Sequence, residues 1–385
     1  MKEFPAEGLV DRVRATLPLV AASSFEAEAQ RRPLDEVISA LEDTGVFRSF
    51  VPKRHGGYEI DMQTYLDIGV AVAEADPSMG WITTFYMEHN WLLGAMFSAE
   101  LVDQIFSARP YLLAPGTVNA NGRATPHPDG SFTLTGQWQF ATGICHADWA
   151  FLSGTIEGDE PPMPRQFLVP VEQVEVKDTW HVDGMAATGS RDIVATGVLV
   201  PPIRASLSPP PALTAGPDAP YLLRIPIAPM LSLTAAIPAL GAARRALALF
   251  GARLHERIQF GTKRTQSNRV PAQVKLANLT IEVDAAETLM RDIACRIQAH
   301  AEGEATYSLA EQQQQRLAIA HIVRRCRDIV RSVLESSGAS AHFLDNELQR
   351  IQRDVHMISA HTVFDVDLLA EAVGRALVAP PETQP

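Results

Sequence analysis

The spacing of hydrophobic and polar residues divides the chain into three blocks. Apolar residues recur with helical periodicity over about the first hundred residues, alternate as in strands from 111 to about 203, and return to helical periodicity from 221 to about 377. This pattern predicts a mostly α protein with a central β-domain. We place a helical domain at 1–110, a small β-barrel at 111–205 and a helical bundle at 221–385. Residues 206–220 (SLSPPPALTAGPDAP) predict a proline-rich linker without regular structure.

Turn and cap residues divide the first block into helices, expected at 33–44, 62–75 and from about Pro77 to Met96. The third is crowded with aromatic side chains, among them Trp81, and also carries His89. So many aromatic rings favour a buried helix that lines a pocket. The alternative is a core helix in which His89 bonds a backbone carbonyl.

Long periodic stretches at 235–254, 271–301 and 309–336 are typical of helices that pack as a bundle. We expect another helix over residues 346–367. There Arg350, Asp354 and His361 fall on one face, whereas His356 lies roughly 140° away from His361. An Arg–Asp pair that fixes the helix, with an imidazole presented to a pocket, is one interpretation. A solvated face with a surface histidine is the other.

Composition excludes several classes of protein. The 385 residues carry a net charge of −12 and contain no basic stripe, which argues against nucleic acid and anionic membranes as partners. Three widely separated cysteines, Cys145, Cys295 and Cys326, fit a reducing compartment and give no disulfide or metal framework. The N-terminus lacks the apolar core of a signal peptide, and we expect no run long enough to span a membrane. These features predict a cytoplasmic protein.

Several short motifs follow one another along nearly the whole chain: GVFRSFVPKRHGGYEI, EADPSMGW, GQWQFATGICHADWAFLSG, WHVDGMAATGSRDIVATGVLVP, RIQFG, SSGAS and LQRIQRDVHMISAH. In this order and spacing they resemble the acyl-CoA dehydrogenase fold. Within it they are similar to the two-component flavin-dependent monooxygenases that hydroxylate aromatic compounds. The resemblance implies reduced FMN or FAD and O2, a small aromatic substrate, and a separate NAD(P)H:flavin reductase that delivers flavin by diffusion. It also implies a homo-oligomer, expected to be a tetramer.

The strand motif GQWQFATG has a physical interpretation of its own. Trp138 and Phe140 alternate with polar residues, as on a strand with one apolar face, and Thr142 and Gly143 end the strand. By the resemblance this strand end meets the flavin ring, with Thr142 bonding near the reactive N5 and with Trp81, Trp138 and Gly143 as further contacts. A threonine in a strand-end turn is the alternative. The following segment, 184–190 (GMAATGS), allows close backbone approach and is assigned a structural role.

The motif RIQFG supplies Arg257, Phe260 and Gly261. In the family this pattern touches the phosphate-bearing tail of the flavin across a subunit interface, and a planar guanidinium suits phosphate oxygens. A helix-end arginine followed by a glycine cap is the alternative. Gly338, in SSGAS, is a further expected cofactor contact by resemblance.

The C-terminal motif decides which reaction the resemblance implies. The Tyr-Glu-Gly-Thr segment that carries the dehydrogenase base is absent, and RDVHMISAH stands in its place. In the hydroxylase branch a histidine at the position of His361 faces the substrate. His361 is therefore expected to be the base or the hydrogen-bond partner of the substrate's ring hydroxyl or N–H. As a base, an imidazole can accept a phenol or indole proton near neutral pH, and the electron-rich ring then attacks a flavin C4a-hydroperoxide. His89 resembles a second histidine of these pockets. Oxygenation at nitrogen or sulfur, a dehydrogenase with another base, and a catalytically silent scaffold stay open.

Without a Rossmann-like glycine fingerprint, the chain is not expected to bind NAD(P)H itself.

Overall fold

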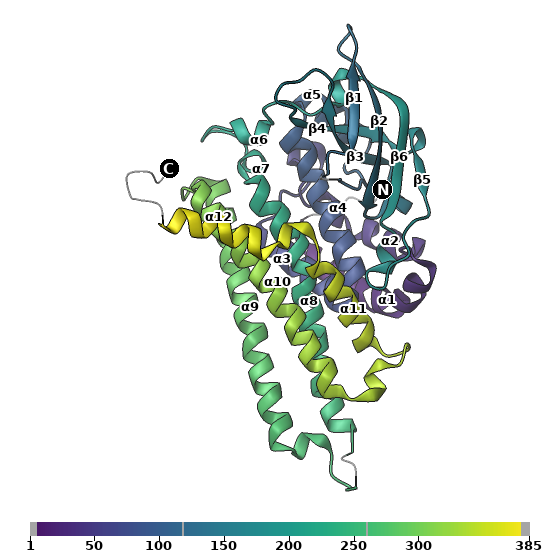
Figure 1. Ribbon diagram of the computed structural model, residues 1–385, viewed down its shortest axis with the longest axis vertical. Coiled ribbons are helices and arrows are strands. Elements are labelled where there is room, and N and C mark those ends of the chain that lie inside the picture. The colour runs from purple at the N-terminus through teal and green to yellow at the C-terminus, as the bar shows by residue number, and fades with distance from the viewer. Residues whose placement is uncertain (1–5, 118, 259–260, 379–385) are drawn as a thin grey trace.

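The computed structural model describes residues 6–117, 119–258 and 261–378 (Figure 1). Helices come first: α1 (Leu9–Gln30), α2 (Asp35–Thr44), α3 (Met62–Ala75), α4 (Pro77–Met96) and α5 (Ala99–Ala108). The bounds of α3 and α4 are those predicted, because both helices begin at a strong cap. The Asp76 carboxylate accepts the Met79 amide at 3.3 Å, and Pro77 occupies the first helical position, where a missing N–H costs nothing.

Six strands then form one sheet: β1 (Gly122–Pro126), β2 (Phe132–Ala141), β3 (Trp149–Ile156), β4 (Pro164–Pro170), β5 (Glu175–Lys177) and β6 (Arg191–Val200). Their order is β4-β3-β1-β2-β6-β5, and every pairing is antiparallel except β1 with β3. The sheet curls around its own apolar core, but β4 and β5 remain its two edges. It is therefore an open, curled half-barrel, and the predicted mostly α fold with a central β-domain is confirmed.

The end of β2 departs from regular alternation. The pairing of β2 with β6 shifts register between Trp138 and Ala141, and Phe140 has a positive φ of 65°. Trp138 is fully buried, whereas Phe140 is 57% exposed. The prediction that these two rings share one apolar face is therefore wrong, because the bulge turns Phe140 to the other side.

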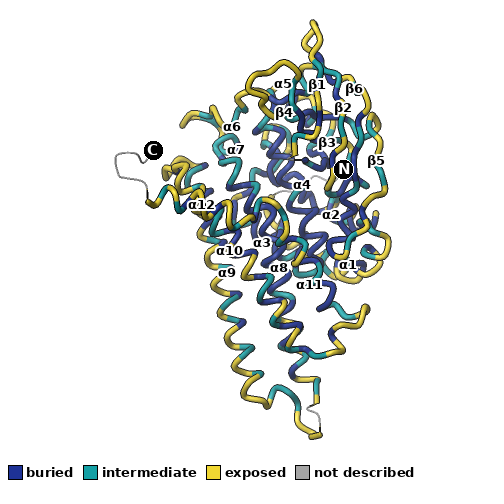
Figure 2. The backbone as a smooth tube through the Cα atoms, in the orientation of Figure 1, coloured by how far each residue is buried: buried dark blue, intermediate teal, exposed yellow. Residues whose placement is uncertain are grey.

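The second helical part contains α6 (Pro211–Thr214), α7 (Tyr221–Arg224), α8 (Ile227–Glu256), α9 (Val270–Glu302), α10 (Leu309–Ser337), α11 (Glu347–Ser359) and α12 (Val366–Val378). The long helices α8, α9 and α10 extend together away from the sheet (Figure 1). The single turn α6 falls in the linker for which no regular structure is predicted. Against the expectation from the sequence, α8 is long and apolar enough to span a membrane. Most of its apolar stretch, 78%, is buried within the protein, as in a core helix (Figure 2).

The helix predicted over 346–367 is interrupted. Helix α11 ends at Ser359, and a short 3₁₀ turn, Thr362–Phe364, precedes α12. His361 has extended backbone angles and caps this turn, with its Nδ1 accepting the Val363 amide at 3.3 Å. The shared helical face therefore holds for Arg350 and Asp354 but does not extend to His361.

A buried charge cluster joins the segments that surround this turn. Arg350 donates to Asp76 at 2.6 Å and lies 3.6 Å from Asp354, and all three side chains are almost fully buried. Asp354 also accepts the backbone amide of Met185. The cluster thus connects the start of α4, helix α11 and the loop 184–190.

Candidate active site

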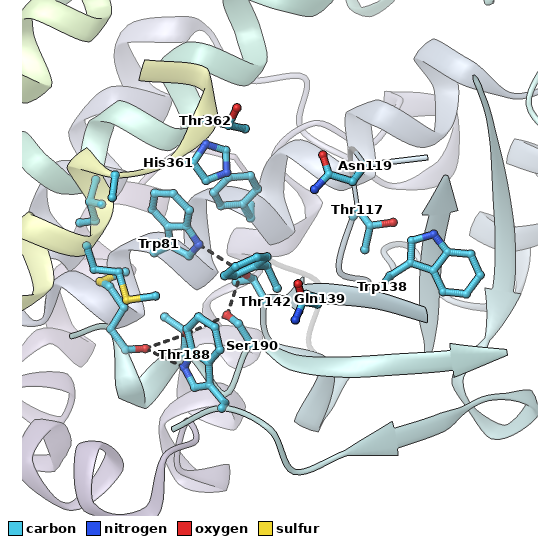
Figure 3. A pocket seen from close by; sticks show the side chains of 18 of the residues that line it. Trp81, Thr117, Asn119, Trp138, Gln139, Thr142, Thr188, Ser190, His361 and Thr362 are labelled. Carbon is cyan, nitrogen blue, oxygen red and sulfur yellow. Dashed lines mark hydrogen bonds between the residues drawn. The ribbon is translucent and has the colours of Figure 1, made fainter. Parts of the chain in front are cut away.

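A cavity of about 370 Å³ lies where α4, the end of β2, the loop 184–190 and the turn after α11 meet (Figure 3). One wall is a row of four rings. Trp81, Phe85 and His89 follow one another at four-residue intervals on α4, with ring centroids 4.7 and 5.5 Å apart, and the His361 ring lies 5.5 Å from Trp81. The four-residue interval stacks side chains on one face of a helix. The two histidines therefore stand at opposite ends of one aromatic wall.

A chain of hydrogen bonds runs from Trp81 in this wall to the loop 184–190. Trp81 Nε1 donates to Thr142 Oγ1 at 3.1 Å. The Thr142 hydroxyl lies 3.0 Å from Ser190 Oγ, and the Ser190 hydroxyl lies 2.7 Å from Thr188 Oγ1. Thr188 in turn donates to the Met185 carbonyl at 2.8 Å. Figure 3 shows this chain crossing from α4 to the end of β2 and then to the loop.

The direction of this chain follows from its two ends. An indole nitrogen can only donate and a carbonyl can only accept, whereas a hydroxyl has one hydrogen to give. All four contacts are satisfied when each hydroxyl donates to the next, from Trp81 through Thr142, Ser190 and Thr188 to Met185. The hydrogen of Thr142 is then used within the chain, and its oxygen keeps a lone pair. Toward the cavity, Thr142 is therefore a hydrogen-bond acceptor.

His361, unlike Thr142, presents a hydrogen-bond donor to the cavity. Its Nδ1 accepts the Val363 amide, so a neutral ring carries its hydrogen on Nε2. Burial lowers the pKa of His361 to about 4, which leaves the ring neutral at physiological pH. His361 therefore offers an N–H donor, which suits the predicted hydrogen-bond partner of the substrate better than the predicted base. His356 is exposed on α11, in keeping with its predicted position off the cavity face.

His89 presents the complementary tautomer. Its Nδ1 lies 2.6 Å from the Ala114 carbonyl, which requires the hydrogen on Nδ1 and leaves a lone pair on Nε2. A side chain on Gly116, which also lines the cavity, would bring its Cβ within 2.7 Å of Nε2, so only glycine leaves this nitrogen room. Burial lowers the pKa of His89 to about 4. His89 thus bonds a backbone carbonyl and also lines the cavity, which joins the two alternatives drawn from the sequence.

An acidic side chain lies beside His89. Glu88 Oε2 is 3.3 Å from His89 Nε2, and Glu88 is fully buried with neither carboxyl oxygen in a hydrogen bond. Burial raises the pKa of Glu88 well above its usual range. Burial therefore favours the uncharged form of this carboxyl group over the carboxylate.

Two of the expected flavin contacts on β2 have mainly structural partners. Trp138 borders the cavity, but its ring is fully buried in the sheet core and its Nε1 donates to the Ser153 carbonyl at 2.7 Å. Gly143 has a left-handed φ of 76°, and a Cβ there would lie 2.5 Å from the Tyr86 hydroxyl, which donates to the Gly143 carbonyl. Gly143 therefore positions Thr142 by letting the chain turn against α4.

The remaining predicted cofactor contacts lie elsewhere. Arg257 follows α8 at the far tip of the bundle, and its guanidinium donates to the Ser337 carbonyl and packs against Gly338. Gly261 is exposed with a φ of 73°, and Phe260 falls outside the residues that the structure describes. Arg257 and Gly338 are thus brought together, but not at the cavity.

Sequence reasoning missed the role of two hydroxyls. Thr188 and Ser190 line the cavity and continue the chain from Thr142, whereas the segment 184–190 is predicted to be structural only. The signal was present in the paired hydroxyls of ATGS. What was missing was their proximity to Thr142, which comes from the pairing of β2 with β6.

Comparison with known proteins places this site in a wider context. Residues 233–366 match the family model "Acyl-CoA dehydrogenase, C-terminal domain". The chain is 31% identical, over 98% of each chain, to a pigment production hydroxylase of Rhodococcus sp. (strain ATCC 21145). It is 28% identical to the oxygenase component of an FADH2-dependent resorcinol hydroxylase of Rhizobium sp. (strain MTP-10005), over 97% of this chain and 95% of that one. The structure of XiaF from Streptomyces sp. in complex with FADH2 and glycerol superposes with a TM-score of 0.88 at 26% identity, covering 97% and 96%.

Proposed function

Since the chain belongs to the flavin-dependent hydroxylases that share the acyl-CoA dehydrogenase fold, we propose that it is the oxygenase component of a two-component monooxygenase. It takes reduced FMN or FAD from a separate reductase and inserts one atom of O2 into a phenolic or indolic ring. The observation that carries this proposal is the pairing of a donor and an acceptor histidine at the two ends of an aromatic wall, facing a directed hydroxyl chain.

The cavity suits a reduced flavin by the chemistry of its lining. Reduced flavin carries a hydrogen on N5 that oxidised flavin lacks, and the directed chain makes Thr142 an acceptor toward the cavity. Thr142 would therefore accept a hydrogen bond from the reduced flavin ring, while Ser190 and Trp81 fix the orientation of the Thr142 hydroxyl. When bound, the flavin supplies the activation of O2, and the protein supplies binding, orientation and exclusion of water.

The two histidines then have separate roles toward the substrate. His89 Nε2 carries the available lone pair and accepts the ring hydroxyl or N–H of the substrate. His361 Nε2–H donates a hydrogen bond where negative charge develops on oxygen. Of the two roles that the sequence predicts for His361, base or hydrogen-bond partner, this assignment keeps the hydrogen-bond partner and gives the acceptor role to His89.

The distant corner around Arg257 fits the same proposal through a second copy of the chain. A guanidinium that already donates to a backbone carbonyl still has N–H groups for phosphate oxygens, and Gly338 leaves it room. We propose that Arg257 binds the phosphate-bearing tail of a flavin whose ring lies in a partner's cavity, within a homo-oligomer such as a tetramer.

The test is a reaction with a generic NADH:flavin reductase, a panel of phenols and indoles, and isotopically labelled O2. We expect a product with one labelled oxygen atom, and mass spectrometry identifies whether carbon, nitrogen or sulfur carries it. Reduced flavin mixed with the protein in air should also reoxidise more slowly than free flavin. Reoxidation at the free-solution rate with no labelled product in the panel would contradict the proposal.

A further inference from the structure

The cavity contains titratable groups but no charge. Among the residues that the structure describes, the only ionisable side chains that line it are His89 and His361, and both are neutral at physiological pH for the reasons given above. No lysine or arginine is part of that lining. An anionic group that enters the cavity therefore meets no counter-charge from the described residues that line it.

Two charged or ionisable side chains near the cavity, Arg350 and Glu88, do not supply the missing positive charge. Arg350, on α11, is not among the lining residues, and its guanidinium is held by Asp76 and Asp354. Glu88, beside His89, would add negative charge if it ionised. In the buried part of the cavity, beside Trp81, His89 and the loop 184–190, a carboxylate would lose its hydration without gaining an ion pair, which is strongly unfavourable.

Neutral polar groups are nevertheless plentiful on one side of the cavity. Hydroxyl and amide groups in the lining come from Thr117, Asn119, Asn121 and Gln139. Figure 3 shows Thr117, Asn119 and Gln139 on the side of Thr142 that faces away from His361. Amides and hydroxyls match hydroxyl, carbonyl and amide substituents on a ring without requiring a charge.

We infer that the substrate is an uncharged aromatic compound, a phenol or indole whose further substituents are hydroxyl, carbonyl or amide groups and not a carboxylate. This inference rests on the proposed function and narrows its substrate class. The cavity disfavours acids because it offers no cation, not because they are too large. Acids and neutral compounds of the same shape should therefore differ in binding affinity.

Matched pairs of ligands test this directly. 4-Hydroxyphenylacetate is compared with its amide, and indole-3-acetate with its amide, by calorimetric titration under anaerobic conditions into flavin-free protein and into protein saturated with reduced flavin. We expect each amide to bind at least tenfold more tightly than its acid. An acid that binds as tightly as its amide, or a panel in which neither amide binds, overturns the inference.

A charge introduced at the cavity provides the converse test. Asn119 is exposed at the lining, so Asn119→Lys should fold and place an ammonium there, and Asn119→Gln is the neutral control. Asn119→Lys should improve the binding of each acid relative to its amide by about tenfold, and Asn119→Gln should not. If the added cation leaves the ratio unchanged, charge is not what excludes the acids, and the inference fails.

Failure of the proposed function has a different signature. In that case the amides bind more tightly than the acids, but no compound acquires an oxygen atom from O2. If instead the acids are the better ligands and are oxygenated efficiently, the monooxygenase proposal stands and the inference about charge is wrong.

Discussion

The cavity and the Arg257 corner are both expected to contact one cofactor, yet they are built in opposite ways. The cavity is lined without lysine, arginine or carboxylate side chains among the described residues, and the hydroxyls of Thr142, Ser190 and Thr188 bond one another in a directed chain. At the corner, Arg253 and Arg257 both donate to the Ser337 carbonyl, and within the described chain neither pairs with a carboxylate. The cavity thus selects by hydrogen-bond polarity and shape, whereas the corner offers uncompensated positive charge. In the proposed function the cavity receives the flavin ring and the substrate, and the corner receives the phosphate groups.

The largest effect is expected from removing the donor of the cavity. His361→Ala should lower product formation on the order of 10²-fold, the usual loss when a donor to developing negative charge is removed. Hydrogen peroxide should appear in its place, because reduced flavin and O2 still react. Product and peroxide are measured per NADH consumed.

The matched control for this variant is His356→Ala, since His356 is exposed on the neighbouring turn of α11. It should couple O2 to product as well as the parent does. Equal behaviour of the two variants would mean that His361 has no special place in the cavity.

A smaller effect is expected at the corner, and in a different quantity. Arg257→Ala should weaken the binding of reduced flavin by about 1.5–3 kcal/mol, roughly tenfold to a hundredfold, through loss of a charge-assisted phosphate contact. Affinity is measured by equilibrium titration, with the melting temperature as a check on folding. Arg264→Ala, at an exposed arginine nearby, is the control. Unchanged affinity would show that Arg257 only caps the bundle tip.

The smallest effect is expected from pH, which tests whether the cavity is uncharged. An ordinary histidine, with a pKa near 6.5, would be mostly protonated at pH 6. Burial lowers the pKa of His89 and His361 to about 4, so both rings stay neutral until the pH approaches 5. Single-turnover product yield should therefore change less than twofold between pH 8 and pH 6 and fall only in more acidic buffer. A midpoint near pH 6.5 would contradict the neutral lining.

The sequence predicts those parts of the molecule that local signals determine. Caps at Asp76 and Pro77 locate α4, and helical periodicity places Trp81 and His89 on one face. Non-local events were not predictable. The bulge before Ala141 turns Phe140 away from Trp138, and it depends on pairing with β6.

His361 lines the cavity, as one interpretation of the sequence predicts, but the predicted structural reason is wrong. Periodicity places it on the face of one long helix, but the chain leaves the helix after Ser359, and a turn brings the ring to Trp81. Its tautomer, which decides donor or base, depends on the Val363 amide, and no pattern of residue types carries that information.

The contact between Trp81 and His361 also has a consequence for biosynthesis. The two rings are separated by 280 positions in the sequence, so the last wall of the cavity forms only after residue 361 has left the ribosome. Until then the ring-bearing face of α4 lacks its cover, and Asp76 lacks the arginine that it holds in the finished protein. Nascent chains that stop before α11 should therefore expose apolar surface and need protection from aggregation, whereas full-length chains should not.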